Sequence, residues 1–105
     1  MSKPFQLDVV SPESTVWSGR AEFVSARTTE GEIGIMADHE PTLAALTTGA
    51  VTVESGNTTV TIGVHGGFLQ ILDNQVTLLT DRAQVSTGTK DDATELARTL
   101  ENQPD

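Results

Sequence analysis

Short runs in which apolar and polar residues alternate are the feature that most constrains how this 105-residue chain folds. Apolar residues stand at every second position in the runs 5–9, 51–53 and 60–64, and most of them are β-branched. A period of two places these side chains on one face of a β-strand, and β-branched residues pack well on that pleated surface. The alternation therefore predicts short strands with one buried face each.

Turn-forming residues interrupt these runs at short intervals. They are Ser11-Pro12, Ser18-Gly19, Glu30-Gly31, Thr48-Gly49, Ser55-Gly56-Asn57, Gly66-Gly67 and Asp73-Asn74. Many short strands separated by such turns are typical of an all-β sandwich or barrel, and two facing sheets bury one side of every strand. We therefore expect a mainly β fold, a sandwich or barrel of short strands, that forms an N-terminal domain over residues 1–85.

The pattern changes after Val85. Residues 86–89 are small and polar, which is typical of a linker, and the residues beyond them follow a helical period. One face of that helix would carry apolar residues spaced i, i+3, i+4 and i+7, namely Ala93, Leu96, Ala97 and Leu100. An isolated helix shorter than ~12–15 residues is only marginally stable in water, so this helix needs a surface to pack on. We expect residues 86–105 to hold a linker and one short C-terminal α-helix, which docks either on the sandwich or on a partner.

The charge balance excludes several classes of partner. Six Lys and Arg residues stand against fifteen Asp and Glu residues, which gives a formal net charge of −9, and the basic residues are scattered along the chain. Nucleic acid and anionic lipid would both be repelled, so neither is expected as a partner. No apolar stretch approaches the ~20 residues that cross a bilayer, so we expect no direct membrane insertion.

No arrangement typical of a catalytic or metal site appears in the sequence. The chain has no cysteine and two histidines, His39 and His65. Asp38, His39 and Glu40 are consecutive, but adjacent side chains diverge in a strand or turn, so a polar loop is the simpler interpretation. Neither a Gly-x-Ser-x-Gly elbow nor a phosphate-binding Gly-x-x-x-x-Gly-Lys loop occurs. We expect no catalytic residue, no metal, no cofactor and no small-molecule substrate.

Several segments, taken in order, resemble a known family. They cover residues 7–13, 30–51, 66–71 and 74–83. Together they resemble the epsilon subunit of bacterial F-type ATP synthases, called delta in mitochondria, over residues 5–85. The resemblance implies a sandwich of two five-stranded sheets followed by a helical region. It also implies a non-catalytic central-stalk subunit that joins the gamma subunit to the c-ring and couples proton translocation to ATP synthesis, placed peripherally at the cytoplasmic face of the bacterial plasma membrane.

By position, the resemblance implies two contact surfaces. The surface toward the c-ring would hold Glu30, Glu32, Asp38 and His39. The surface toward the gamma subunit would hold Gly66, Gly67 and Phe68. The two glycines equally suit a β-bulge, a tight bend or a close approach of another backbone.

Two features depart from the family pattern. Family loops usually read Pro-Gly before the histidine, whereas Ala37-Asp38 stands there in this chain. Family members often carry a two-helix hairpin that inhibits ATP hydrolysis, and residues 87–105 are too few for a long hairpin. We expect hairpin-type inhibition to be reduced or absent.

Two other functions are weighed against the rotor role. A stand-alone β-sandwich binding module, for example for carbohydrate, fits the fold, but only 4% of the residues are aromatic. A small cupin-like enzyme would need a His-x-His pair with a nearby Glu, which the chain lacks. Co-purification with a gamma subunit would separate the rotor role from both.

Overall fold

A computed structural model describes residues 3–86 and contains ten β-strands in that part of the chain. The strands are β1 (Phe5–Val10), β2 (Thr15–Ala21), β3 (Phe23–Thr28), β4 (Gly31–Ile35), β5 (Thr42–Leu46), β6 (Gly49–Ser55), β7 (Thr58–His65), β8 (Gly67–Leu72), β9 (Gln75–Leu79) and β10 (Arg82–Ser86). The predicted number of strands is confirmed. The predicted C-terminal helix falls outside the described residues. No helix within residues 3–86 is long and apolar enough to cross a membrane.

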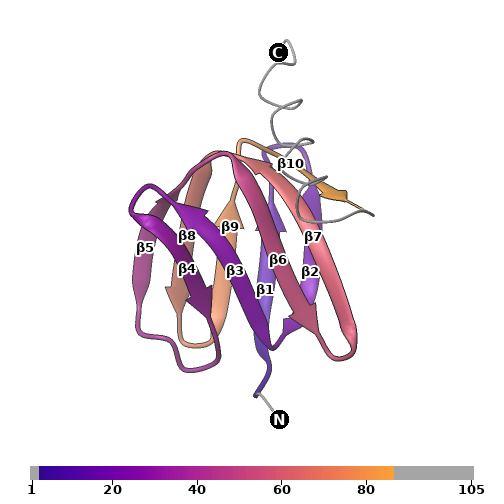
Figure 1. The fold of residues 1–105 in the computed structure, drawn as a ribbon, viewed down its shortest axis with the longest axis vertical. Coiled ribbons are helices and arrows are strands. Elements are labelled where there is room, and N and C mark those ends of the chain that lie inside the picture. Colours follow the sequence, from indigo (N-terminus) through magenta and orange to yellow (C-terminus); the bar gives the residue numbers. More distant parts are fainter. Residues whose placement is uncertain (1–2, 87–105) are drawn as a thin grey trace.

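The strands form two facing layers (Figure 1). One layer has the order β4-β3-β6-β7-β10 and the other the order β5-β8-β9-β1-β2. Strand β3 joins the layers at one side, because its first half pairs with β6 and its last residue, Thr28, pairs with Leu46 of β5. The result is a sandwich of two five-stranded sheets that share one continuous ladder, which makes it close to a barrel. The predicted two-sheet architecture is confirmed.

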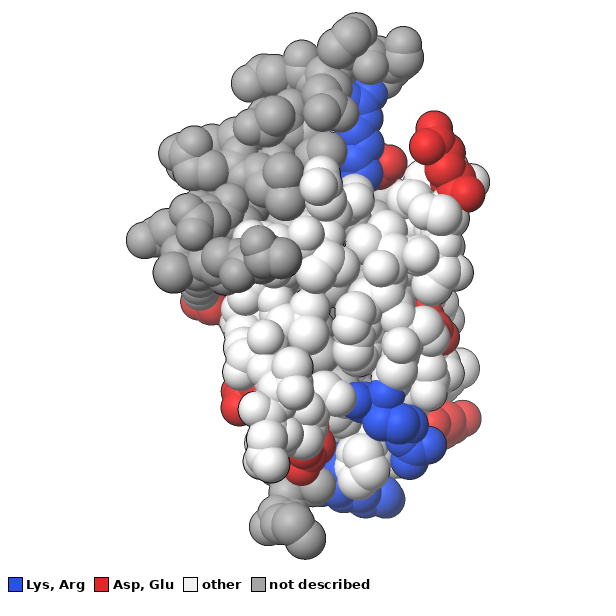
Figure 2. Space-filling view, turned by 90° about the vertical axis from the view of Figure 1, so that its right-hand side faces the viewer, with Lys and Arg blue, Asp and Glu red and all other residues white. Residues whose placement is uncertain are grey.

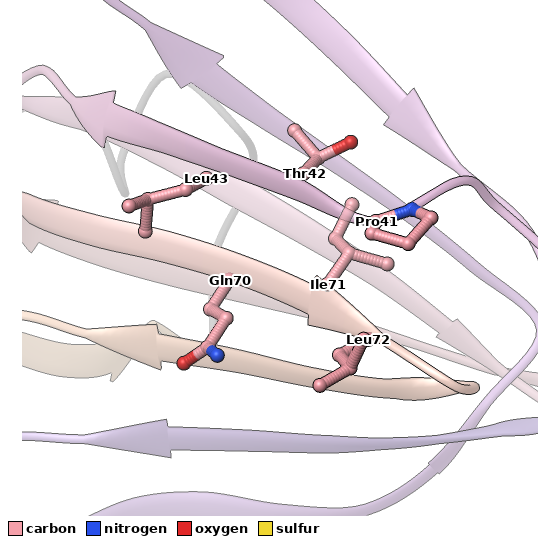
Figure 3. Close-up of a pocket in the computed structure, with 6 residues that line it drawn as sticks. All are labelled: Pro41, Thr42, Leu43, Gln70, Ile71 and Leu72. Carbon is pink, nitrogen blue, oxygen red and sulfur yellow. The ribbon is translucent and has the colours of Figure 1, made fainter.

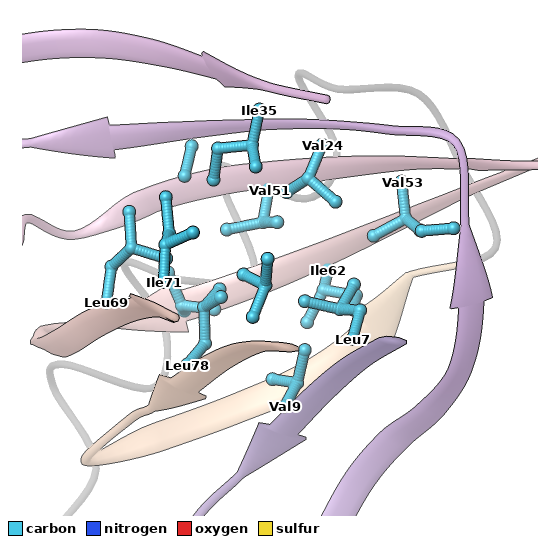
Figure 4. Close-up of a cluster of buried hydrophobic side chains, with 14 of the residues drawn as sticks. Leu7, Val9, Val24, Ile35, Val51, Val53, Ile62, Leu69, Ile71 and Leu78 are labelled. Atoms are coloured by element: carbon cyan, nitrogen blue, oxygen red, sulfur yellow. The ribbon is translucent and has the colours of Figure 1, made fainter. Parts of the chain in front are cut away.

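The core lies between the two layers and is built almost wholly of aliphatic side chains (Figure 4). Phe5, Leu7 and Val9 of β1 are buried, as their alternation predicts, and they meet buried side chains of the other layer such as Val51 and Ile62. Every buried side-chain nitrogen or oxygen within residues 3–86 has a hydrogen-bond partner. An interior packed in this way has low compressibility. The described part of the chain is therefore a stiff body.

The turns divide between two ends of the sandwich (Figure 1). One end, called here the His39 end, holds the β4–β5 loop of residues 36–41 and the β8–β9 turn of residues 73–74. The other end, called the Gly66 end, holds the β3–β4 turn of residues 29–30, the β7–β8 turn at Gly66 and the β9–β10 turn. Because each strand runs from one end to the other, residues close in sequence on either side of a strand are separated by its length.

Candidate functional site

Exposed apolar side chains gather on one outer face of the sandwich. Within residues 3–86 the exposed large apolar side chains are Met36, Leu43, Phe68, Leu72, Leu79 and Val85. Four of these stand on the outer face of the β5-β8-β9-β1-β2 sheet: Leu43, Phe68, Leu72 and Leu79. They point outward because their strand neighbours Leu69, Ile71 and Leu78 point into the core, and successive side chains of a strand alternate between faces.

Strand register joins part of this surface into a row. Phe68 pairs with Ala45 of β5 on one side and with Leu79 of β9 on the other. Leu79 in turn pairs with Val10 of β1. These four residues, called here the apolar row, cross four adjacent strands near the Gly66 end. Phe68 is 55% exposed and Leu79 is 50% exposed, so the row is open to a partner.

A shallow hollow of about 300 Å³ adjoins the apolar row on the same face. It is lined by Pro41, Thr42, Leu43, Gln70, Ile71 and Leu72 (Figure 3). Leu43 and Gln70 stand opposite each other across β5 and β8, and Leu72 lies farther along β8. The hollow extends the apolar surface from Phe68 toward the His39 end. Its walls suit an apolar side chain of a protein partner.

The outer face of the other sheet has a different chemistry. The outward-pointing side chains of β3, β6 and β7 include Ser25, Arg27, Thr52, Glu54 and Thr59. Seen from the side on which β2, β7 and β10 lie, Lys and Arg side chains appear toward the two ends, and Asp and Glu side chains lie mainly along the edges of the view (Figure 2). Exposed large apolar side chains within residues 3–86 are therefore concentrated on one sheet.

Asp8 organises the polar part of the same sheet face that carries the apolar row. Its carboxylate accepts hydrogen bonds from Ser18 Oγ at 2.5 Å, Gln75 Nε2 at 2.8 Å and Gln6 Nε2 at 3.1 Å. These donors stand on three adjacent strands, so the carboxylate ties β2, β1 and β9 together. The hydrogen bond from Ser18, with smaller effects of Gln6 and Gln75, holds the pKa of the Asp8 carboxyl below its usual value, although partial burial acts the other way.

Replacing Asp8 with asparagine is expected to flatten the dependence of stability on acid pH. A carboxyl whose pKa is lowered by folding stabilises the protein above its unfolded pKa, near ~3.9, and this contribution is lost as the pH falls through the folded pKa. The free energy of unfolding should therefore fall less steeply below about pH 4 in Asp8→Asn than in the wild type. Urea unfolding between neutral and acid pH measures this, with Glu13→Gln in the exposed β1–β2 connection as the control. Parallel curves for Asp8→Asn and the wild type would contradict the prediction.

The β4–β5 loop at the His39 end is tied to the β8–β9 turn. The Asp38 N–H donates to Asn74 Oδ1 at 2.5 Å, and Asn74 Nδ2 donates back to Asp38 Oδ1 at 3.0 Å. Lys3 Nζ lies 3.3 Å from the same carboxylate oxygen. The hydrogen bond from Asn74, followed by the hydrogen bond and the charge of Lys3, lowers the pKa of the Asp38 carboxyl.

His39 stands next to this contact, and within residues 3–86 only its Nδ1 has hydrogen-bonding neighbours. Its Nδ1 lies 2.9 Å from the carbonyl oxygen of Glu40. A carbonyl oxygen can only accept, so Nδ1 carries the proton and Nε2 is the acceptor of the neutral ring. Within residues 3–86 no three His, Asp or Glu side chains lie close enough together to hold a metal ion.

A family model described as the ATP synthase delta/epsilon chain, beta-sandwich domain, matches residues 4–86. This chain belongs to that family. The ATP synthase epsilon chain of Streptomyces avermitilis is 41% identical to it over 87 residues, which are 82% of this chain and 70% of the relative. The ATP synthase epsilon chain of Corynebacterium efficiens is 46% identical over 79 residues, which are 73% of this chain and 64% of the relative.

Solved structures of ATP synthases contain chains of the same fold as this delta/epsilon chain. A chain of the Euglena gracilis mitochondrial ATP synthase, solved with OSCP, F1 and the c-ring, matches with a TM-score of 0.73 at 27% identity, over 94% of this chain and 66% of that chain. A chain of the Tetrahymena thermophila central stalk and c-ring matches with a TM-score of 0.66 at 14% identity, over 95% and 92%. That second likeness concerns the fold alone. The resemblance found in the sequence and the expectation of a non-catalytic ATP synthase subunit are confirmed.

The fold of this delta/epsilon chain separates the residues that sequence analysis assigned to the c-ring surface. Asp38 and His39 lie together at the His39 end, whereas Glu30 lies in the turn at the opposite end of β4. Glu32 stands between them on β4, where its carboxylate accepts a hydrogen bond from Ser25 Oγ at 2.8 Å. The five residues of β4 span ~16 Å. A partner at the His39 end reaches Glu30 only if it also covers the outer edge of β4.

The residues assigned to the gamma surface lie together, but they differ in what they do. Gly66 and Gly67 have φ values of 67° and 112° and form the bend between β7 and β8. Phe68 follows them and stands in the apolar row. Sequence analysis missed the other members of the row, Val10 on β1, Ala45 on β5 and Leu79 on β9. One signal was present, because Leu78 and Leu79 are adjacent and only one of two adjacent strand residues can face the core.

Proposed function

We propose that this delta/epsilon chain is a central-stalk subunit that links a gamma subunit to a c-ring and so couples proton translocation to ATP synthesis. The observation that carries the proposal is the apolar row, an exposed band of side chains on one outer face of a body whose family belongs to ATP synthase. Exposed apolar patches of this kind mark protein-binding surfaces, and aromatic side chains are common anchors in them. In this proposal Phe68 anchors the gamma subunit, and Gly66 and Gly67 hold it in place.

The contact with the c-ring is proposed for the His39 end. Asp38, His39 and Glu40 give that loop an acidic and hydrogen-bonding character, which suits a basic or polar loop of the partner. Glu32 and Glu30 join the same contact where the partner extends along the outer edge of β4. The two proposed surfaces occupy different parts of the sandwich, so the body stands between its partners.

The proposed role is mechanical and needs no chemical step in this chain. Torque from a turning ring reaches the stalk only if the connecting body does not deform, and a tightly packed aliphatic core resists deformation. The same proposal places the chain peripherally at the cytoplasmic face of a bacterial plasma membrane, held there by its partners. Reduced or absent hairpin-type inhibition concerns residues outside 3–86 and stays a prediction.

Binding to each partner separately is the test of this function. The full chain should bind a purified gamma subunit, and it should bind a detergent-solubilised c-ring, measured by biolayer interferometry with each partner immobilised in turn. A glycan array serves as the comparison for the stand-alone binding module. Binding to glycans with no affinity for either rotor partner would overturn the proposal in favour of that alternative.

A further inference from the structure

Three non-glycine residues within 3–86 have positive φ angles, and all three lie at the His39 end. Asp38 has a φ of 66°, Asp73 a φ of 50° and Asn74 a φ of 62°. Residues other than glycine adopt this left-handed backbone conformation at an energetic cost, which is smallest for asparagine and aspartate. Asp38 is the one of the three that lies in the 36–41 loop, and a hydrogen-bonded contact can offset the cost of its backbone conformation.

The offsetting contact is a reciprocal hydrogen-bonded pair between Asp38 and Asn74, which are 36 positions apart. The side-chain amide of Asn74 is used at both of its atoms, since Oδ1 accepts from the Asp38 N–H and Nδ2 donates to the Asp38 carboxylate. Hydrogen bonds to a charged carboxylate are stronger than neutral ones. A glycine at position 38 has no side chain with which to form the second bond.

Asn74 is itself fixed to the sheet, so its hydrogen bonds to Asp38 can hold the loop in a fixed position relative to the sheet. Its carbonyl oxygen accepts a hydrogen bond from the Gln6 N–H at 3.0 Å, and it is followed at once by β9. The Lys3 ion pair to Asp38 contributes less, because its side chains are 63% and 68% exposed and exposed ion pairs stabilise weakly. Asn74 is the link that joins the loop to rigid structure.

We propose that Asn74 is a positioning residue that fixes the 36–41 loop for its partner, so that Asp38 acts within the chain while His39 and Glu40 face the partner. The inference rests on the proposed c-ring contact. His39 then presents Nε2, because its Nδ1 is engaged by the Glu40 carbonyl. The complementary group on the partner is a hydrogen-bond donor, basic or neutral. The orientation of the His39 imidazole then determines the specificity of this chain for the c-ring.

The test compares two glycine substitutions in one turn. Asn74→Gly keeps the positive φ and removes the amide, whereas Asp73→Gly keeps the same backbone and leaves the Asp38–Asn74 pair intact. We expect Asn74→Gly in the full chain to bind solubilised c-ring about five- to tenfold more weakly, which corresponds to the loss of about one net hydrogen bond. Binding to the gamma subunit should not change, and Asp73→Gly should bind both partners like the wild type. Wild-type affinity of Asn74→Gly for the c-ring would overturn the inference.

An exchange of the two residues distinguishes positioning from a general structural role. In the double variant Asp38→Asn with Asn74→Asp, a carboxylate at 74 accepts from the backbone N–H at 38 and an amide at 38 donates back, with the net charge unchanged. This exchange should restore c-ring binding, and failure to restore it would count against the pair. Hydrogen exchange at the residue 38 N–H measures the order of the loop in the absence of any partner. It should be slow in the wild type and in the double variant, and fast in Asn74→Gly. Failure of the wild type to bind the c-ring would contradict the proposed function. Fast hydrogen exchange at the residue 38 N–H of the wild type would contradict this inference instead.

Discussion

Replacing Gly67 with alanine is expected to unfold the protein. The added Cβ would lie 2.0 Å from the carbonyl oxygen of Leu79 and 2.7 Å from the Cα of Thr80, and both are backbone atoms. Neither backbone atom can move away, because Phe68 pairs with Leu79 in the β8–β9 ladder and the Thr80 N–H donates a hydrogen bond to the carbonyl of Val10. We expect a loss of more than about 4 kcal/mol in the free energy of unfolding, a large share of what a small domain has.

Gly31 supplies the matched control for this experiment. Its φ of 121° is close to the 112° of Gly67, but a Cβ at Gly31 meets nothing within 4 Å. Gly31→Ala therefore carries the cost of the backbone conformation alone, about 1–3 kcal/mol. Soluble yield and urea unfolding followed by circular dichroism compare the two variants. A Gly67→Ala protein as stable as Gly31→Ala would show that the backbones at this bend are not held so close together.

The contact at Gly67 also distinguishes the interpretations that the sequence left open for the Gly66-Gly67 pair. A close approach of backbones is what the geometry requires at Gly67, since the atoms that exclude a side chain belong to residues 79 and 80. At Gly66 the nearest atom is the carboxylate of Asp81, at 3.0 Å from an added Cβ, and a side chain of this kind can move. Both glycines therefore form the bend through their positive φ angles, and Gly67 also lets β8 lie against the end of β9.

Local pattern was enough to predict a mainly β fold of short strands that each bury one face. The alternation of Phe5, Leu7 and Val9 corresponds to the buried positions of β1, and the glycine at position 31 begins β4 with a positive φ. These features depend on one strand or one turn at a time. They are decided by side-chain period and by the conformational freedom of single residues, both of which are visible in the sequence.

Contacts between distant segments were beyond what the sequence could indicate. The apolar row depends on the register that sets Phe68 beside Leu79 and Leu79 beside Val10, and nothing in the local pattern specifies a parallel pairing of β1 with β9. The pair of Asp38 and Asn74 depends on two turns that meet only after the sheets have formed. Residues 30 to 39 looked like one surface in the sequence, but β4 carries its two ends to opposite ends of the sandwich.

Introducing a charge at Phe68 is expected to weaken binding to the gamma subunit strongly and leave the fold intact. The side chain is 55% exposed and contributes to the outer surface, so Phe68→Glu should change the free energy of unfolding by less than about 1 kcal/mol. Binding loses the burial of an aromatic side chain and must also desolvate a carboxylate, so we expect at least a 30-fold weaker affinity, roughly 2 kcal/mol. Biolayer interferometry against immobilised gamma subunit measures the change.

Met36→Glu is the control that separates the loss of the apolar contact at Phe68 from the general effect of an added negative charge. Met36 is 58% exposed, nearly as much as Phe68, and the substitution adds the same charge, but it lies at the His39 end, outside the apolar row. If any added charge weakened binding to gamma through long-range repulsion, both variants would lose affinity together, and the loss would shrink at high salt. If the apolar row is the docking surface, only Phe68→Glu loses affinity, Leu79→Ala loses a smaller part of it, and salt changes neither loss much. Retention of wild-type affinity by Phe68→Glu would mean that gamma binds elsewhere and that the exposed row serves another partner.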